Sequence, residues 1–132
     1  VVRRARSAAT SAGNSTTGIR AIQTPFNPHS AGAFTKRIHQ GRNRPQSTLW
    51  FAADAGLSVF VTDPIASDPL PRDVASRISG QTTIQKNLNF ARSAPGVTSV
   101  LMPASTVESL QEAIAAGHHA PIGAESFDEM FE

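Results

Sequence analysis

The sequence has 132 residues, of which 39% are hydrophobic, which is enough apolar material for one modest domain with a core. It contains no cysteine, which excludes disulfides, thiolate metal sites and a thiol nucleophile. Residues 1–46 hold eight of the twelve Lys and Arg residues and no acidic residue, whereas residues 47–132 carry all ten acidic side chains. The charge is therefore polarised along the chain. Its apolar runs are too short to span a bilayer, so we expect no membrane anchor.

Residues 1–17 form a basic arm rich in Ser and Ala, for which we expect mostly irregular structure with at most a short helix. This composition fits a solvated arm, the remnant of a mitochondrial targeting peptide, or a segment that binds RNA or an acidic protein partner. The composition is compatible with a protein of the cytoplasm or of the mitochondrial matrix. RNA binding would use seven of the eight basic side chains of the first 46 residues: Arg3, Arg4, Arg6, Lys36, Arg37, Arg42 and Arg44.

The first half of the chain predicts two strands and one helix. Residues 19–26 have the pattern of a short buried strand closed by prolines, and residues 27–46 are expected to be a mobile basic loop. Residues 49–55 predict a helix that ends at Gly56. Residues 57–62 are apolar and β-branched, which is typical of a strand covered on both faces. Three prolines in residues 63–71 make that segment a loop.

The second half predicts two further helices with a strand between them. From residue 83 the apolar side chains recur at helical spacing until Pro95 and Gly96, and residues 97–102 predict a third strand. The sequence of residues 105–108, STVE, predicts a capping box in which Ser105 caps the last helix, which extends to Gly117. Residues 118–132 form an acidic tail with apolar side chains on one side.

This alternation of strands and helices predicts an α/β fold with parallel strands and right-handed crossovers. Three parallel strands make a poor sheet by themselves, because their outer edges leave main-chain hydrogen-bonding groups unpaired. We therefore expect another protein chain to complete or cover the sheet.

Three segments in order are similar to the C-terminal part of the aldo/keto reductase fold. Residues 19–27, IRAIQTPFN, resemble its sixth strand, and residues 52–66, AADAGLSVFVTDPIA, resemble a helix end, the seventh strand and the loop after it. Residues 89–101, NFARSAPGVTSVL, resemble the helix, turn and eighth strand before the cofactor loop. The resemblance implies that residues 18–117 are about the last three βα units of a TIM-type barrel.

The resemblance also implies a parent activity, NADP-dependent reduction of carbonyl compounds by an oxidoreductase. It assigns the nicotinamide carboxamide to Gln23, the pyrophosphate to the loop with Pro64 and Ile65, and the adenosine phosphate to Ser105, Thr106 and the amides beside them. A side-chain amide suits the first task because it both donates and accepts, although Gln23 is equally well explained as a polar strand residue. Capping alone equally explains the serine and threonine.

Several departures argue against NADP binding by this chain. Asp63 would repel a phosphate, Pro103 stands where the family often has glycine, and Ala113 stands in place of the family's adenine-side asparagine. The family's catalytic Asp, Tyr, Lys and His come from earlier strands, and this sequence has no tyrosine. His118 and His119 are adjacent and do not face one site on a helix, so we expect no metal site.

We therefore expect no catalytic residue and no carbonyl reduction by this chain alone. One interpretation is a pseudoenzyme, an aldo/keto-reductase-like domain that has lost its chemistry. The alternative is a structural subunit of a larger assembly, in which the basic arm binds RNA or an acidic partner. A split barrel, in which a separate chain supplies the first strands, is a third hypothesis.

Overall fold

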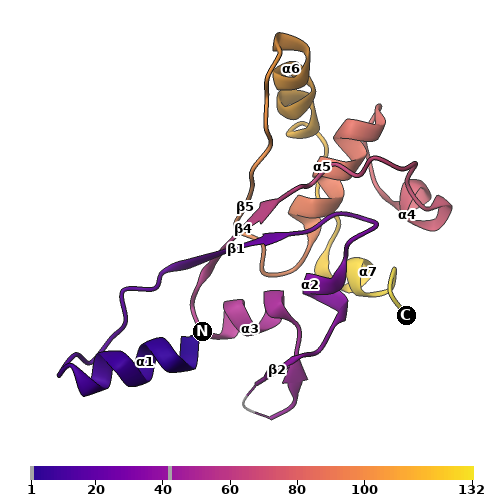
Figure 1. Ribbon diagram of the computed structural model, residues 1–132. Coiled ribbons are helices and arrows are strands. Elements are labelled where there is room, and N and C mark those ends of the chain that lie inside the picture. The colour runs from indigo at the N-terminus through magenta and orange to yellow at the C-terminus, as the bar shows by residue number, and fades with distance from the viewer. Residues whose placement is uncertain (1, 42) are drawn as a thin grey trace.

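The computed structural model of the protein describes residues 2–41 and 43–132 (Figure 1). Its helices are α1 Val2–Ser11, α2 Gly32–Thr35, α3 Thr48–Asp54, α4 Arg72–Arg77, α5 Thr83–Ser93, α6 Val107–Ala116 and α7 Ala124–Asp128. Its strands are β1 Ala21–Pro25, β2 His39–Gln40, β3 Pro45–Gln46, β4 Ser58–Thr62 and β5 Ser99–Val100.

Three of these strands form one parallel sheet in the order β1-β4-β5, while β2 and β3 form a separate antiparallel hairpin. The register places Gln23 opposite Phe60, and Phe60 opposite Ser99. The prediction of a mixed α/β fold with parallel strands is confirmed. The sheet is open, and no closed barrel forms among the described residues.

The core lies on one face of this sheet. Val59 and Val61 of β4 are fully buried there, against Leu49 and Ala52 of α3 and against apolar residues of α5. The side chains that alternate with these valines, including Phe60, are only half-buried. The expectation that β4 is covered on both faces is therefore wrong within the described residues, because α3 and α5 both pack on the same side and α6 packs on α5.

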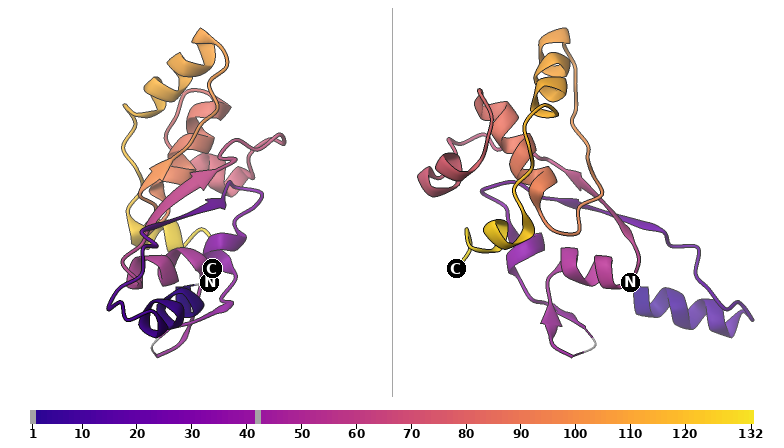
Figure 2. Two further views of the ribbon diagram at one scale, coloured as in Figure 1. Left: turned by 60° about the vertical axis from the view of Figure 1, so that its left-hand side comes forward. Right: turned by 180° about the vertical axis from the view of Figure 1, so that it is seen from behind.

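The molecule is elongated, with α6 and the β2–β3 hairpin at its opposite ends in every view (Figures 1 and 2). The first turn of α1 lies beside α3, and its remaining turns point away from the rest of the chain (Figure 1). The sheet thus sits between two projecting parts and is not enclosed by them.

Aromatic rings join the end of β1 to the C-terminal segment. Phe26 stacks on Phe90 with ring centroids 5.3 Å apart, and Phe127 lies 5.0 Å from Phe90 and 5.2 Å from Phe34. Phe26, Phe90 and Phe127 are fully buried. Residues 118–132, an acidic tail by sequence, therefore supply part of the core through α7, because the apolar side of this segment covers the rings of α2 and α5.

Two segments are more ordered than the sequence predicted. The short helix allowed for the basic arm is present as α1 and takes up residues 2–11, more of the arm than the mostly irregular structure that we expected; Gly13 terminates it with φ of 77° while the Asn14 amide donates to the Ala9 carbonyl. The predicted mobile loop of residues 27–46 contains α2 and the β2–β3 hairpin. Burial of Phe34 explains why α2 forms, because packing this ring against other rings is favourable.

Two boundaries were also predicted wrongly. The third strand pairs only over Ser99 and Val100, instead of over residues 97–102, since the chain leaves the sheet after Leu101 donates to the Val61 carbonyl. The cap of α6 is Thr106 and not Ser105. The Thr106 hydroxyl accepts from the Ser109 amide at 3.1 Å, and the Thr106 amide donates to the Ser109 hydroxyl at 3.1 Å, so serine takes the place that we assigned to Glu108.

Other boundaries agree with the sequence. Helix α3 ends before Gly56, and α5 ends before the Pro95-Gly96 turn. Gly96 has φ of 88°, and a Cβ at this position would lie 3.0 Å from the Leu49 carbonyl oxygen. Glycine is required here both for the backbone conformation and for the close approach of α3.

Replacing Phe127 with alanine is expected to lower the free energy of unfolding by about 3–5 kcal/mol, because it removes a fully buried ring from the aromatic cluster. Urea denaturation followed by circular dichroism measures this change. The control is Val107→Ala, since that side chain is 66% exposed, and it should change the free energy by less than about 0.5 kcal/mol. Equal midpoints for the two variants would contradict a core built on α7.

Candidate functional site

A cavity of about 780 Å³ lies beside β1, and we call it the β1 groove. Four elements line it: β1, the β2–β3 hairpin, α3 and the first turn of α1. The lining includes Arg3, Gln23, His39, Thr48, Phe51 and Leu57. It contains one guanidinium group and no carboxylate among the described residues.

The hairpin wall of the β1 groove is fixed by His39. Its ring stacks on Phe51 with centroids 5.1 Å apart, and its Nε2 lies 3.0 Å from the Thr48 hydroxyl oxygen. Both partners belong to α3, so the imidazole ties the hairpin to that helix. Sequence reasoning did not find this arrangement, because the residues are nine to twelve positions apart and show no motif.

The outer edge of β1 is unpaired. The Ser58 amide donates to the Arg20 carbonyl and the Phe26 amide donates to the Thr62 carbonyl, so the even-numbered residues of this strand bond to β4. The main-chain groups of Ala21 and Gln23 must then point outward. Among the described residues, β1 pairs with no other strand. Pro25 occupies an outward position where its missing amide hydrogen costs nothing.

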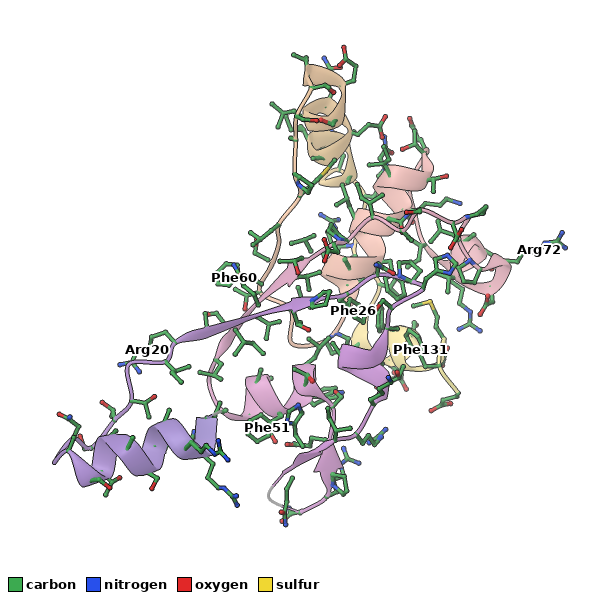
Figure 3. The ribbon with its side chains drawn as sticks, viewed as in Figure 1. Arg20, Phe26, Phe51, Phe60, Arg72 and Phe131 are labelled. Carbon is green, nitrogen blue, oxygen red and sulfur yellow. The ribbon has the colours of Figure 1, made fainter. Side chains whose placement is uncertain are left out.

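The face of the sheet opposite the core is also open. Gln23 and Ser99 are exposed on either side of Phe60, and Leu101 keeps 40% of its surface exposed. Figure 3 shows Phe60 and Phe26 on different sides of the sheet, with Phe26 toward α7. An aromatic ring on an uncovered face indicates a surface that another group can bury.

The loops after β1 and β4 meet at the carboxyl edge of the sheet. The Asn27 side-chain amide donates to the Asp63 carbonyl at 3.0 Å, and its oxygen accepts from the amides of His29 and Ser30. The ring of His29 lies 2.9 Å from the Pro69 carbonyl oxygen. Asp63 has φ of 49°, the left-handed region that residues other than glycine seldom adopt. These bonds hold the loop of residues 63–71 against the end of the sheet.

The residues that the resemblance assigned to NADP do not converge on one cavity. Gln23 lies at the β1 groove, Pro64 is fully buried and Ile65 is half-buried. Ser105 and Thr106 are exposed at the start of α6, the end that lies farthest from the sheet (Figure 1). The hydroxyl of Thr106 is already engaged in the helix cap.

A second cavity, of about 650 Å³, lies between the hairpin and the C-terminal segment. Arg37, Arg44 and Trp50 line it, together with the carboxylates Asp54, Asp128 and Glu132. The Gln46 amide donates to the carboxylate of Asp54. Its mixture of charges favours neither anions nor cations, so this cavity gives no clear ligand class.

The other basic side chains that we expected to contact RNA are dispersed. Arg3, Arg4 and Arg6 are exposed on α1, and Lys36 is exposed at the end of α2. Arg42 lies outside the described residues. The described part of the chain contains no group of three His, Asp or Glu side chains that could hold a metal ion. None of its helices is long and apolar enough to cross a membrane.

A scan against protein-family models finds no family that matches the chain, and a search of curated proteins finds no matching sequence.

Removing the Asn27 side chain in Asn27→Ala is expected to lower the free energy of unfolding by about 1–2 kcal/mol, since three hydrogen bonds are lost. Asn27→Asp keeps the oxygen that accepts from the two amides and loses only the donor to Asp63, so its effect should be smaller. Urea denaturation of both variants tests this order. An aspartate variant as unstable as the alanine variant would show that the bond to Asp63 dominates.

Proposed function

We propose that the chain forms a non-catalytic α/β binding module, derived from an aldo/keto reductase barrel, and that another protein chain completes its sheet. The observation that carries the proposal is the central strand β4. It has apolar side chains on both faces, but α3 and α5 cover only the face that holds Val59 and Val61. Phe60, on the other face, is flanked by exposed residues of both neighbouring strands.

The strand order supports the derivation from a TIM-type barrel. Consecutive strands of such a barrel are parallel neighbours, with helices on the outside and side chains packed inside. The order β1-β4-β5 follows the chain, and the three strands are parallel. In this interpretation the helix-covered face is the barrel exterior, and the face with Phe60 is the interior that the missing units would fill.

The arrangement of side chains supports binding in preference to reduction of carbonyl compounds. General acid catalysis needs a proton donor within hydrogen-bonding distance of the substrate oxygen, and the family's tyrosine has no counterpart in this sequence. NADP would need contacts from Gln23 of β1 and from the start of α6, and these two elements lie in different parts of the molecule (Figure 1). The proposed module therefore keeps the family's architecture without its cofactor chemistry.

The test is assembly with a separately purified chain that carries the strand-helix units preceding the sixth strand of an aldo/keto reductase barrel. We expect a one-to-one complex by sedimentation, because the open edge and face are then paired and buried. Phe60→Glu should abolish the complex, since it places a charge in the buried layer. The control variant Glu108→Gln, at an exposed position of α6, should assemble normally.

Two results would overturn the proposal. One is assembly of Phe60→Glu as tightly as the unsubstituted chain, with both proteins folded by circular dichroism. The other is oxidation of NADPH with an aldehyde by the purified chain alone, since the proposal assigns no turnover to it.

A second function, RNA binding by the basic arm, is favoured by the conformation of α1. The helix places Arg3, Arg4 and Arg6 within two turns, and all three side chains are exposed. Deleting residues 1–44 is not a clean test, because the deletion would also remove β1 and the buried rings of Phe26 and Phe34. Substitutions within the arm leave the core intact.

The triple substitution of Arg3, Arg4 and Arg6 by glutamine should weaken binding of a single-stranded oligouridylate and reduce the slope of log K against log salt by about 2. Fluorescence anisotropy at several salt concentrations measures both quantities. Arg72→Gln is the control, because this arginine is exposed on α4, on another side of the molecule (Figure 3). An unchanged slope in the triple variant would exclude the arm as the RNA-binding segment.

A further inference from the structure

The free edge of β1 and the β1 groove form one continuous surface. Ala21 and Gln23 direct their main-chain groups outward, and Ile22 and Gln23 line the groove. An added strand can pair with such an edge through its main chain, while alternate side chains enter an adjoining pocket. The edge ends at Pro25, which offers no amide donor, so only a short segment can pair.

The walls of the β1 groove select an apolar side chain. Leu57 and Phe51 supply apolar surface, and Ile38 at the hairpin keeps 74% of its surface exposed. A large aliphatic side chain so exposed gains free energy when a partner covers it. One face of the Phe51 ring is stacked on His39, so that face is not free for a nucleic acid base.

The charges around the β1 groove select an acidic partner. Arg3 lines the groove. Arg20, which is not a lining residue, directly precedes β1, is exposed at the end of the strand nearest α1 (Figure 3), and donates to the Thr17 carbonyl. No carboxylate lines the groove among the described residues, and Asp54 of α3 lines the other cavity. An extended segment with acidic residues beside an apolar one would match this surface in charge as well as in shape.

We propose that the β1 groove binds an extended acidic and apolar peptide segment of a partner protein, which adds a strand to β1 by pairing with the main chain of Ala21 and Gln23. The inference rests on the proposed completion of the sheet by another chain, and it names the chemistry of the segment that contacts this edge. In this inference Arg3, the basic residue that lines the groove, contacts the acidic side chains of the protein partner.

The probe is an N-acetylated, fluorescein-labelled peptide of about seven residues in which valine alternates with glutamate. Two further forms carry N-methyl groups on alternate residues, one form for each edge of the peptide strand. We expect one methylated form to bind at least about tenfold more weakly by fluorescence anisotropy, because it loses the donors that face β1, and the other to bind like the parent peptide. This comparison leaves the protein unchanged, so it does not depend on the folding of a variant.

Amide hydrogen exchange locates the site. Bound peptide should slow exchange of the Ala21 and Gln23 amides, whereas the Ile22 and Thr24 amides, which already face β4, should change little. Arg3→Glu should weaken binding about tenfold, while Arg72→Glu, matched in charge change, should have no effect. A peptide with lysine in place of glutamate should bind more weakly than the parent.

Equal binding of both methylated peptides, or unchanged exchange at Ala21 and Gln23, would overturn strand addition at this edge. Preferential binding of the oligouridylate in competition with the peptide would assign the groove to RNA instead. If the peptide fails to bind while the complementary barrel chain still assembles, the inference is wrong and the proposed function stands. If the peptide binds and the barrel chain does not, the site exists without the proposed barrel partner.

Discussion

The aromatic cluster of Phe26, Phe90 and Phe127 is the interaction on which the rest of the structure depends. These rings come from the end of β1, from α5 and from α7, so their packing joins segments that are far apart in the sequence. The cluster lies on the helix side of the sheet, and buried residues of α2, α3 and α5 pack on the same side. The burial of apolar surface is thus concentrated on one face, and the opposite face is left to solvent or to a partner.

This one-sided core leaves parts of the sheet without partners among the described residues. The sheet keeps a free edge at β1 and a half-buried ring at Phe60, and both are features that other chains can use. The side chains suited to cofactor contacts lie instead on separate parts of the molecule. Pro25 limits the free edge to a few main-chain groups, which protects the sheet from indiscriminate pairing and leaves room for a short, specific strand.

The sequence predicted the parallel strand pattern, the helix that ends at Gly56, the proline-rich loop and the helix that ends at the Pro95-Gly96 turn. Each depends on signals within a few residues, such as caps, glycines and prolines. It failed for α2 and the β2–β3 hairpin, because Phe34 and His39 are ordered by distant rings, Phe127 and Phe51. The β1 groove could not be predicted either, because its walls come from four elements. Of its lining residues, only Gln23, as a cofactor contact, and Arg3, as an RNA contact, had been noted as site candidates.

The sequence by itself determined which side chains are available and where strands can form. It has a basic N-terminal segment without acidic residues, no cysteine, no tyrosine, and three apolar runs suited to parallel strands. Those properties are fixed by residue identity and by local backbone preferences. The tertiary structure alone decided that the helices cover one face, that the edge of β1 is free, and that Arg3, His39 and Phe51 share one groove. These features arise from contacts between segments distant in sequence, and their free energy depends on which surfaces meet when the chain folds.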